Sequence, residues 1–177
     1  MPKFLKTLFP NLEKPDFGSA PAVDPTGPNP AIKLAGKAMP LLGPVFSLEA
    51  DLQAIIFNLG TYDADAVQAD ISKTIKSAPV VIYSYGLSPF STEAIAVLES
   101  TGARFENVQL GLEWFALGPK ASATRVQLRK MYGQGSLPHI FIGGEWVGGL
   151  ATGANGGLSG LVERGELMPM LKKARAI

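Results

Sequence analysis

The stretch Val80–Ser91, VVIYSYGLSPFS, constrains most strongly what this chain can fold into. Val80–Tyr83 is a short β-branched and aromatic run ended by Gly86, which predicts a buried strand. Ser88 and Pro89 are residue types of a helix N-cap and first helical position, so a helix should begin directly after the strand. Aligned N–H groups at such a helix start stabilise an anion and lower the pKa of a cysteine placed there.

At this helix start the sequence carries serine, first Ser88 and three residues later Ser91, and the 177 residues include no cysteine. A serine hydroxyl is far less acidic than a thiol, and a helix N-terminus cannot bridge that difference. The chain as written therefore has no disulfide, no thiolate metal site and no thiol–disulfide exchange of its own. The sequence predicts the architecture of a redox site without its reactive atom, and we expect no metal and no cofactor.

Composition divides the chain into an N-terminal appendage and a compact domain. Residues 1–46 hold nine of the 14 prolines, and proline at that density favours extended or turn conformations over helices and sheet ladders. An extended tail without a core of its own becomes ordered only by what it lies against. We therefore expect residues 1–46 to dock on a partner protein. The alternatives are a tail packed on its own domain and a disordered linker.

An amphipathic helix and linker are predicted over residues 47–62. Ser47 is a suitable N-cap, Gly60 ends the helix, and apolar side chains between them share one face that must be buried. These apolar residues are Leu48, Leu52, Ile55, Ile56 and Leu59.

Residues 63–177 are assigned to the folded domain, which Asp63 begins as the N-cap of a helix reaching about Ser77. The later elements are expected as a helix from Pro89 to about Ser100, a strand over Phe105–Leu110, a helix over Ala123–Tyr132, strands over His139–Ile142 and Glu145–Val147, and helical turns over 157–174 interrupted at Gly165 and Pro169. A helix between the first two strands predicts that they pair in parallel, and Gly143-Gly144 predicts an antiparallel hairpin. The expected class is α/β, with a mixed sheet.

This order of elements and four local motifs resemble the glutaredoxin branch of the thioredoxin fold, over Asp65–Leu171. The motifs are the stretch Val80–Ser91, the loop Gly133–Pro138 (GQGSLP), the strand and turn His139–Gly144 (HIFIGG), and Gly148-Gly149 followed by LSGLVERGEL at 158–167. The resemblance implies a thioredoxin-like, four-stranded mixed sheet flanked by helices, with a Pro-rich N-terminal extension.

The resemblance also implies where the functional site lies. Ser88-Pro89-Phe90-Ser91 stands in place of the family's Cys-Pro-x-Cys and is interpreted as a vestigial redox motif with no catalytic residue. The family's proline before the third strand is cis, so Pro138 should be cis, and the Leu137 backbone should face the glutathione peptide. Gln134, Leu137 and Pro138 are what remains of a glutathione groove, with Arg125 as a further candidate.

Other features depart from the family pattern. Tyr85 occupies the place of a basic residue that meets a glutathione carboxylate. In the family, a pair of residues that includes an aspartate usually follows the double glycine. Here its place is taken by an insertion at Leu150–Ala154 and then by Asn155-Gly156-Gly157. The loss of both cysteines together with these groups indicates a site that no longer works on glutathione.

The single histidine and two loop aromatics suggest further roles. His139 is the only histidine and could act as base toward Ser88, but no carboxylate is placed to orient its ring, which favours a structural strand residue. The serines are better explained as helix caps. Trp114 and Phe115 either form an exposed docking patch or pack on the core, and both interpretations stay open.

The function expected from these residues is a non-catalytic structural or interaction subunit of a larger assembly, contacted through the tail. The alternatives are a glutathione-dependent disulfide oxidoreductase whose two cysteines were replaced by serine, and an enzyme using the surviving groove. A net charge of +1 indicates no nucleic-acid partner, and no apolar run reaches about 18 residues, so no transmembrane helix is expected.

Location is suggested by resemblance alone. Residues 111–122 and 149–157 look more like glutaredoxin forms of photosynthetic eukaryotes than like cytosolic ones. This implies a plastid protein, on the stromal side of a thylakoid complex such as a photosystem and peripheral to the membrane. Otherwise a cytoplasmic location is expected.

Overall fold

The computed structural model describes Ala35, Leu52, residues 62–112 and residues 118–177. The predicted docking tail and the predicted helix over residues 48–59, apart from Ala35 and Leu52, lie outside the described residues, and so do Trp114 and Phe115. Leu52 is helical and 50% exposed, although the sequence places it on an apolar face expected to be buried.

The domain alternates helices and strands around one sheet. In chain order the elements are α4 Ala64–Ile75, β1 Val80–Tyr85, α5 Pro89–Ser100, β2 Glu106–Gly111, α6 Pro119–Tyr132, β3 His139–Ile142, β4 Glu145–Gly148, the 3-10 turn η2 Ala154–Gly156, α7 Gly157–Glu163 and α8 Leu167–Lys173. The strand order is β2-β1-β3-β4. β1 pairs with β2 in parallel and with β3 antiparallel, and β3 and β4 form an antiparallel pair. The predicted four-stranded mixed sheet is confirmed.

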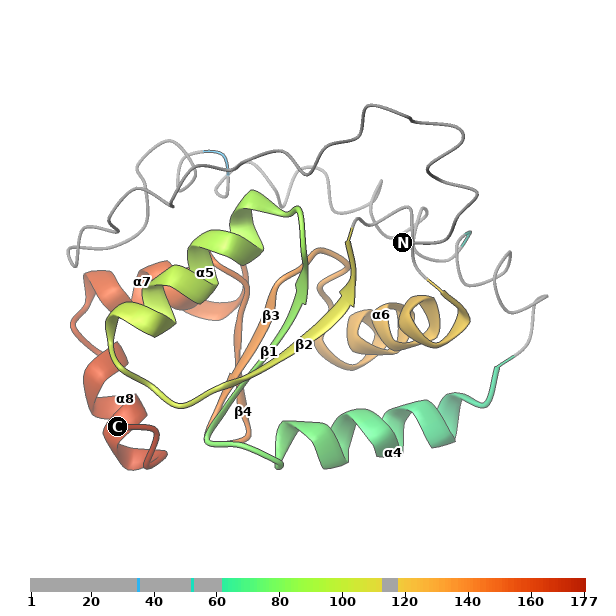
Figure 1. The fold of residues 1–177 in the computed structure, drawn as a ribbon, viewed down its shortest axis with the longest axis horizontal. Helices are drawn as coiled ribbons and strands as arrows, with labels where there is room; N and C mark the ends of the chain where they lie inside the picture. The colour runs from blue at the N-terminus through green and yellow to red at the C-terminus, as the bar shows by residue number, and fades with distance from the viewer. Residues whose placement is uncertain (1–34, 36–51, 53–61, 113–117) are drawn as a thin grey trace, which may run out of the picture.

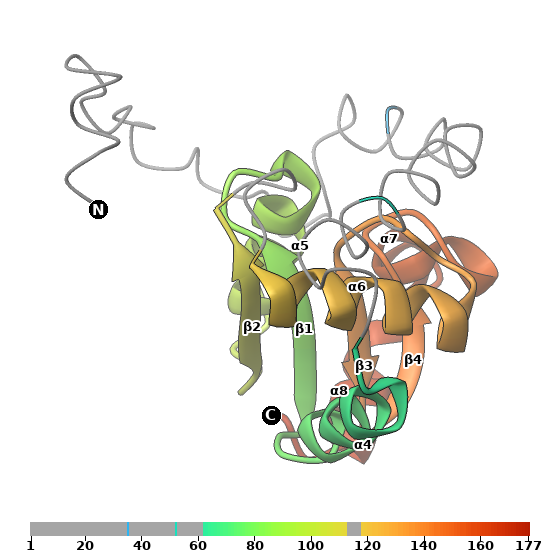
Figure 2. The same cartoon turned by 90° about the vertical axis from the view of Figure 1, so that its right-hand side faces the viewer.

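Helices cover both faces of the sheet. Figure 1 shows α5, α7 and α8 on one side and α4 and α6 on the other, and Figure 2 shows the same layers from the side. All six residues of β1 are buried, because successive side chains point to opposite faces and both faces are covered. Ile82 packs in the cluster under α5, α7 and α8, whereas Tyr83 packs in the cluster under α4 and α6. The buried strand predicted from Val80–Tyr83 is confirmed.

The helix starts follow the capping residues. Asp63 caps α4, and its carboxylate accepts a hydrogen bond of 2.9 Å from the Ala66 N–H. Ser88 caps α5, and Pro89 is its first residue, because proline lacks the N–H that would be unpaired at that position. Both predicted caps are confirmed.

Several predicted boundaries need correction. β1 runs on to Tyr85, since Ser84 and Tyr85 still pair with β2 across a register shift. α6 begins at Pro119 rather than Ala123, after the N-cap Gly118, which is the same use of proline at a helix start. Pro169 does not interrupt a helix, because it lies in the first turn of α8, where proline is tolerated.

Within the described ranges, no helix is long and apolar enough to cross a bilayer.

Candidate functional site

The junction of β1 and α5 places both serines where their hydroxyls hold the fold together. The Ser88 Oγ accepts a hydrogen bond of 3.2 Å from the Ser91 N–H, as an N-cap does. Ser91 is fully buried, and its Oγ accepts a hydrogen bond of 3.2 Å from the Tyr85 N–H. The two side chains therefore fix the end of the strand to the first turn of the helix.

The loop before β3 approaches this junction. The Leu137–Pro138 bond is cis, as predicted. The Gln134 amide nitrogen donates to the carbonyl oxygens of Ser136 and Pro138 at 2.9 and 3.0 Å, and its Oε1 accepts from the Thr152 hydroxyl at 2.8 Å. The hydrogen bonds of Gln134 thus stabilise its own loop and link this loop to the segment after β4.

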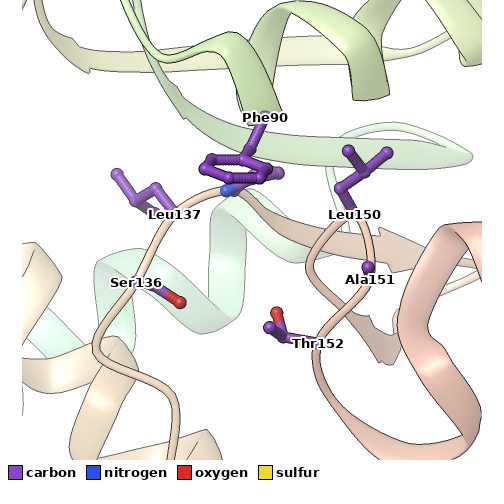
Figure 3. Close-up of a pocket in the computed structure, with 7 residues that line it drawn as sticks. Phe90, Ser136, Leu137, Leu150, Ala151 and Thr152 are labelled. Atoms are coloured by element: carbon purple, nitrogen blue, oxygen red, sulfur yellow. The ribbon is translucent and has the colours of Figure 1, made fainter. Parts of the chain in front are cut away.

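The hollow between the helix start and the loop is small. Figure 3 shows Phe90 above the loop, with Ser136 and Leu137 on one side and Leu150, Ala151 and Thr152 on the other. Its volume is about 10 Å³, which is close to the least space that holds one water molecule.

The inserted segment after β4 forms one wall of this hollow and is folded tightly on itself. The Gly149 N–H donates to the Thr152 carbonyl oxygen at 2.9 Å, and Leu158 and Ser159 donate to the carbonyl oxygens of Gly149 and Leu150 at 3.0 and 2.7 Å. A Cβ on Gly157 would lie 2.4 Å from the Gly149 oxygen, and the φ of Gly157 is +59°. Glycine is therefore required for this close backbone approach.

Known proteins with similar sequences identify this arrangement. Glutaredoxin-C6 of Oryza sativa subsp. japonica is 32% identical over 109 residues, which is 62% of this chain and 88% of that protein. The chain belongs to the glutaredoxin family. Glutaredoxin-C2 of Arabidopsis thaliana is 31% identical over 103 residues, covering 58% of this chain and 84% of that protein. No family model matches the chain.

Solved glutaredoxin structures agree with the fold. The holo form of glutaredoxin C1 from Populus tremula x tremuloides superposes with a TM-score of 0.56 at 29% identity, over 64% of this chain and 94% of that one. A buckwheat glutaredoxin–glutathione complex, at 23% identity, covers the same shares with a TM-score of 0.53. The predicted thioredoxin-like class is confirmed.

Relative to the glutaredoxin pattern, Tyr85 and Arg125 are turned inward. Tyr85 is buried at the end of β1, and the Arg125 guanidinium carbon lies 5.8 Å from the centre of its ring, within range of a cation–π contact. Arg125 is buried as well and donates from Nε to the Gly135 carbonyl oxygen at 3.1 Å. The structure therefore uses this arginine inside the domain and does not present it at the surface of the groove.

His139 is a structural residue of β3. Its Nε2 lies 2.9 Å from the Gln134 carbonyl oxygen, and its Nδ1 accepts a hydrogen bond of 3.1 Å from the Trp146 indole N–H. This assigns the neutral ring with the proton on Nε2. The pKa of His139 is lowered to about 4, mainly by burial; the Gln134 hydrogen bond opposes this change, and the positive charge of Arg125 adds to it. With both ring nitrogens engaged, His139 cannot serve as base toward Ser88.

No group of three or more histidine or acidic side chains able to hold a metal ion occurs in the part of the chain that the structure describes.

One site-forming contact could not be read from the sequence. Thr152 belongs to the insertion and Gln134 to the loop before β3, and a hydrogen bond joins the two segments. The insertion itself was visible as a departure from the family pattern, but nothing in the sequence indicated which residue it would contact.

Proposed function

We propose that this protein is a non-catalytic member of the glutaredoxin family and acts as a structural or interaction subunit of a larger assembly. The observation that carries the proposal is the use of both serine hydroxyls at the start of α5. Ser88 caps the helix and Ser91 satisfies a buried backbone N–H. Neither hydroxyl has the acidity of a thiol, so the positions that would exchange disulfides serve the fold instead.

The groove supports the same interpretation. Of the residues remaining from a glutathione site, Gln134 has its amide engaged by its own loop and by Thr152, and the hollow beside Phe90 has a volume of only about 10 Å³. These side chains are occupied within the domain, which supports a role that depends on the surface of the domain rather than on redox chemistry.

For location we propose a plastid, with a thylakoid complex such as a photosystem as the partner assembly and contact at its stromal side. Two relatives, each 28% identical, are named as chloroplastic: monothiol glutaredoxin-S12 and glutaredoxin-C5 of Arabidopsis thaliana. The thylakoid partner follows only from the resemblance of residues 111–122 and 149–157 to forms of photosynthetic eukaryotes. Fractionation of plastids with an antibody against the domain tests it.

Restoring the thiol tests the loss of catalysis. We expect Ser88→Cys to be alkylated by iodoacetamide below the usual thiol pKa, because the helix start favours the thiolate. We also expect it to reduce a glutathione mixed disulfide no faster than Ser88→Ala, because the Gln134 amide is engaged by internal contacts and Tyr85 stands where the family pattern has a basic residue. The alkylation rate shows that the thiol is accessible, so the two results are independent. Robust glutathione-dependent turnover by Ser88→Cys would contradict the proposal.

Deleting residues 1–46 tests the proposed anchor. We expect the remaining chain to keep its far-ultraviolet circular dichroism and its unfolding midpoint, and to lose co-sedimentation with its partner assembly on a gradient. A matched chain in which residues 1–46 are kept but Leu87 and Leu112, two exposed apolar side chains of the domain, are changed to serine is the control. Unchanged association after deletion would show that the tail is not the anchor.

A further inference from the structure

The turn that leads from the inserted segment into α7 contains Asn155-Gly156, the only Asn-Gly pair in the sequence. Asn155 has φ 59° and ψ 26°, and Gly156 has φ 79° and ψ 21°. These are the angles of the two central residues of a type I′ turn. Asn-Gly is the preferred pair for such a turn, because both residue types tolerate positive φ.

The same pair is chemically reactive. Glycine has no side chain to hinder its backbone nitrogen, so the Gly156 nitrogen can attack the side-chain carbonyl carbon of Asn155. A C–N bond forms and closes a succinimide ring, the side-chain nitrogen leaves as ammonia, and the Gly156 amide proton passes through water to that ammonia. A water molecule then opens the ring at either carbonyl carbon and yields aspartate or isoaspartate. Both residues are exposed, so water has access to them.

The fold holds Asn155 in a conformation that cannot close this ring. Ring closure needs the Gly156 nitrogen on the same side of the Asn155 Cα–C bond as Cβ. With a ψ of 26°, the tetrahedral geometry of Cα places that nitrogen nearly opposite Cβ. The backbone must therefore rotate about the Cα–C bond before the reaction can begin.

Two contacts oppose this rotation, because both engage the Asn155 carbonyl oxygen, which would turn together with the Gly156 nitrogen. The Arg164 Nη1 donates a hydrogen bond of 2.7 Å to this oxygen. The oxygen also lies against Gly160 of α7, where a Cβ would collide with it. The Arg164 guanidinium is itself oriented by a hydrogen bond of 2.8 Å from Nε to the Glu166 carboxylate. A charged donor and close packing thus hold the same carbonyl group.

We propose that Asn155-Gly156 is a site of spontaneous deamidation that the fold protects through Arg164. Asn155 stays intact while its carbonyl oxygen is held, and the ring closes when the segment opens locally. The product adds a negative charge to the turn, and isoaspartate also lengthens the backbone by one methylene. The modification therefore records opening of this segment. The proposal does not depend on the function proposed above, because it needs only the chemistry of this turn.

Mass spectrometry of the full chain, incubated at neutral pH, tests the site. We expect Asn155 to be converted at least tenfold faster in guanidinium chloride than in native buffer. In guanidinium chloride it should also be converted at least tenfold faster than Asn107, because the branched side chain of Val108 hinders the corresponding attack. Equal rates in the two solvents, or at the two asparagines of the denatured chain, would overturn the proposal.

The products identify the chemical route. Ring opening should give isoaspartate as well as aspartate at position 155, and methylation by an isoaspartyl methyltransferase counts the isoaspartate. Direct hydrolysis of the side-chain amide gives aspartate alone, so the absence of isoaspartate would contradict ring closure.

Arg164→Ala tests the protection. This variant lacks the charged donor, so we expect conversion of Asn155 in native buffer to be at least threefold faster, with the rate in guanidinium chloride unchanged. Lys173→Ala removes the same charge from an exposed position of α8 and should leave both rates as in the wild type. An unchanged native rate in Arg164→Ala, or an equal rise in Lys173→Ala, would contradict protection by Arg164.

Ile71→Ala distinguishes local opening from unfolding of the whole domain. Ile71 is buried in the cluster under α4 and α6, on the other face of the sheet, so its truncation lowers overall stability and leaves the turn intact. We expect the native rate at Asn155 to stay within twofold of the wild type. A rise as large as that in Arg164→Ala would show that the modification follows global unfolding and would contradict the proposed protection.

Discussion

Ser91 has no contact with solvent, and its hydroxyl accepts a hydrogen bond from the Tyr85 backbone. A buried donor left without a partner costs about 1–3 kcal/mol, so an oxygen at this position stabilises the junction of β1 and α5. The same logic applies to Gln134, whose amide is engaged on both sides. At the scale of single residues, groups that could have faced a ligand are turned to internal contacts.

His139 makes the stability of the fold depend on pH. Its pKa is about 4 in the folded protein and 6.5 without the fold, so the unfolded chain takes up a proton that the folded chain resists. The stability that this difference in pKa gives the folded state is fully present above pH 6.5 and is lost as the pH falls toward 4. The difference between the two pKa values corresponds to roughly 3 kcal/mol of unfolding free energy.

The comparison of wild type with His139→Gln isolates this effect. We expect the free energy of unfolding of the wild type to fall more steeply between pH 6.5 and pH 4.5 than that of His139→Gln, measured by urea denaturation. The carboxylates titrate in both proteins, so the difference between the two slopes reports His139. Parallel slopes would mean that His139 is not held neutral.

Among the elements, the segment after β4 carries the insertion that departs from the family pattern. The segment folds back on its own beginning. The Gly149 N–H donates a hydrogen bond to the Thr152 carbonyl oxygen, and the Arg164 guanidinium donates one of 2.7 Å to the Asn155 carbonyl oxygen. Asn155 itself has a φ of +59°, a conformation that asparagine tolerates better than most residues. The segment is therefore a defined wall of the groove.

Gly160 allows α7 to pack against this wall. A Cβ at this position would lie 1.9 Å from the Asn155 oxygen, so we expect Gly160→Ala to displace the segment and to lower the free energy of unfolding by about 1–3 kcal/mol. Gly118→Ser is the matched control, because serine is a preferred N-cap residue and a Cβ there meets nothing within 4 Å. Thermal unfolding of the two variants measures the difference, and equal midpoints would show that the segment yields to the added methyl.

Across the whole molecule, one sheet joins two apolar clusters. Leu171 belongs to the cluster under α5, α7 and α8, and Ile71 to the cluster under α4 and α6. β1 contributes to both, since its residues are buried on either side. The two clusters should therefore unfold together.

Truncation on each face tests this cooperativity. We expect Leu171→Ala and Ile71→Ala each to cost about 2–5 kcal/mol, because both side chains are buried, and to keep a single transition with the wild-type urea dependence. Met168→Ala is the control, because Met168 is 43% exposed and such positions change stability by about 0.5 kcal/mol or less. A second transition in either core variant would show that the faces unfold separately.

Prediction from sequence succeeded where the cause was local. The caps Asp63 and Ser88, the strand at Val80 and the hairpin at Gly143-Gly144 follow from residue types at adjacent positions. It failed where packing decided the outcome. Arg125 was a candidate for the groove and is buried instead, because its contacts with Tyr85 and Gly135 depend on how α6 packs against β1 and the loop before β3.

The sequence by itself determined that a strand leads into a capped helix and that this helix carries hydroxyls where thiols would be needed for exchange. Only the tertiary structure decided what those hydroxyls do and where the inserted segment is fastened. The physical reason is that hydrogen bonds such as that from Thr152 to Gln134 join residues far apart in the chain. Local spacing carries no information about such contacts.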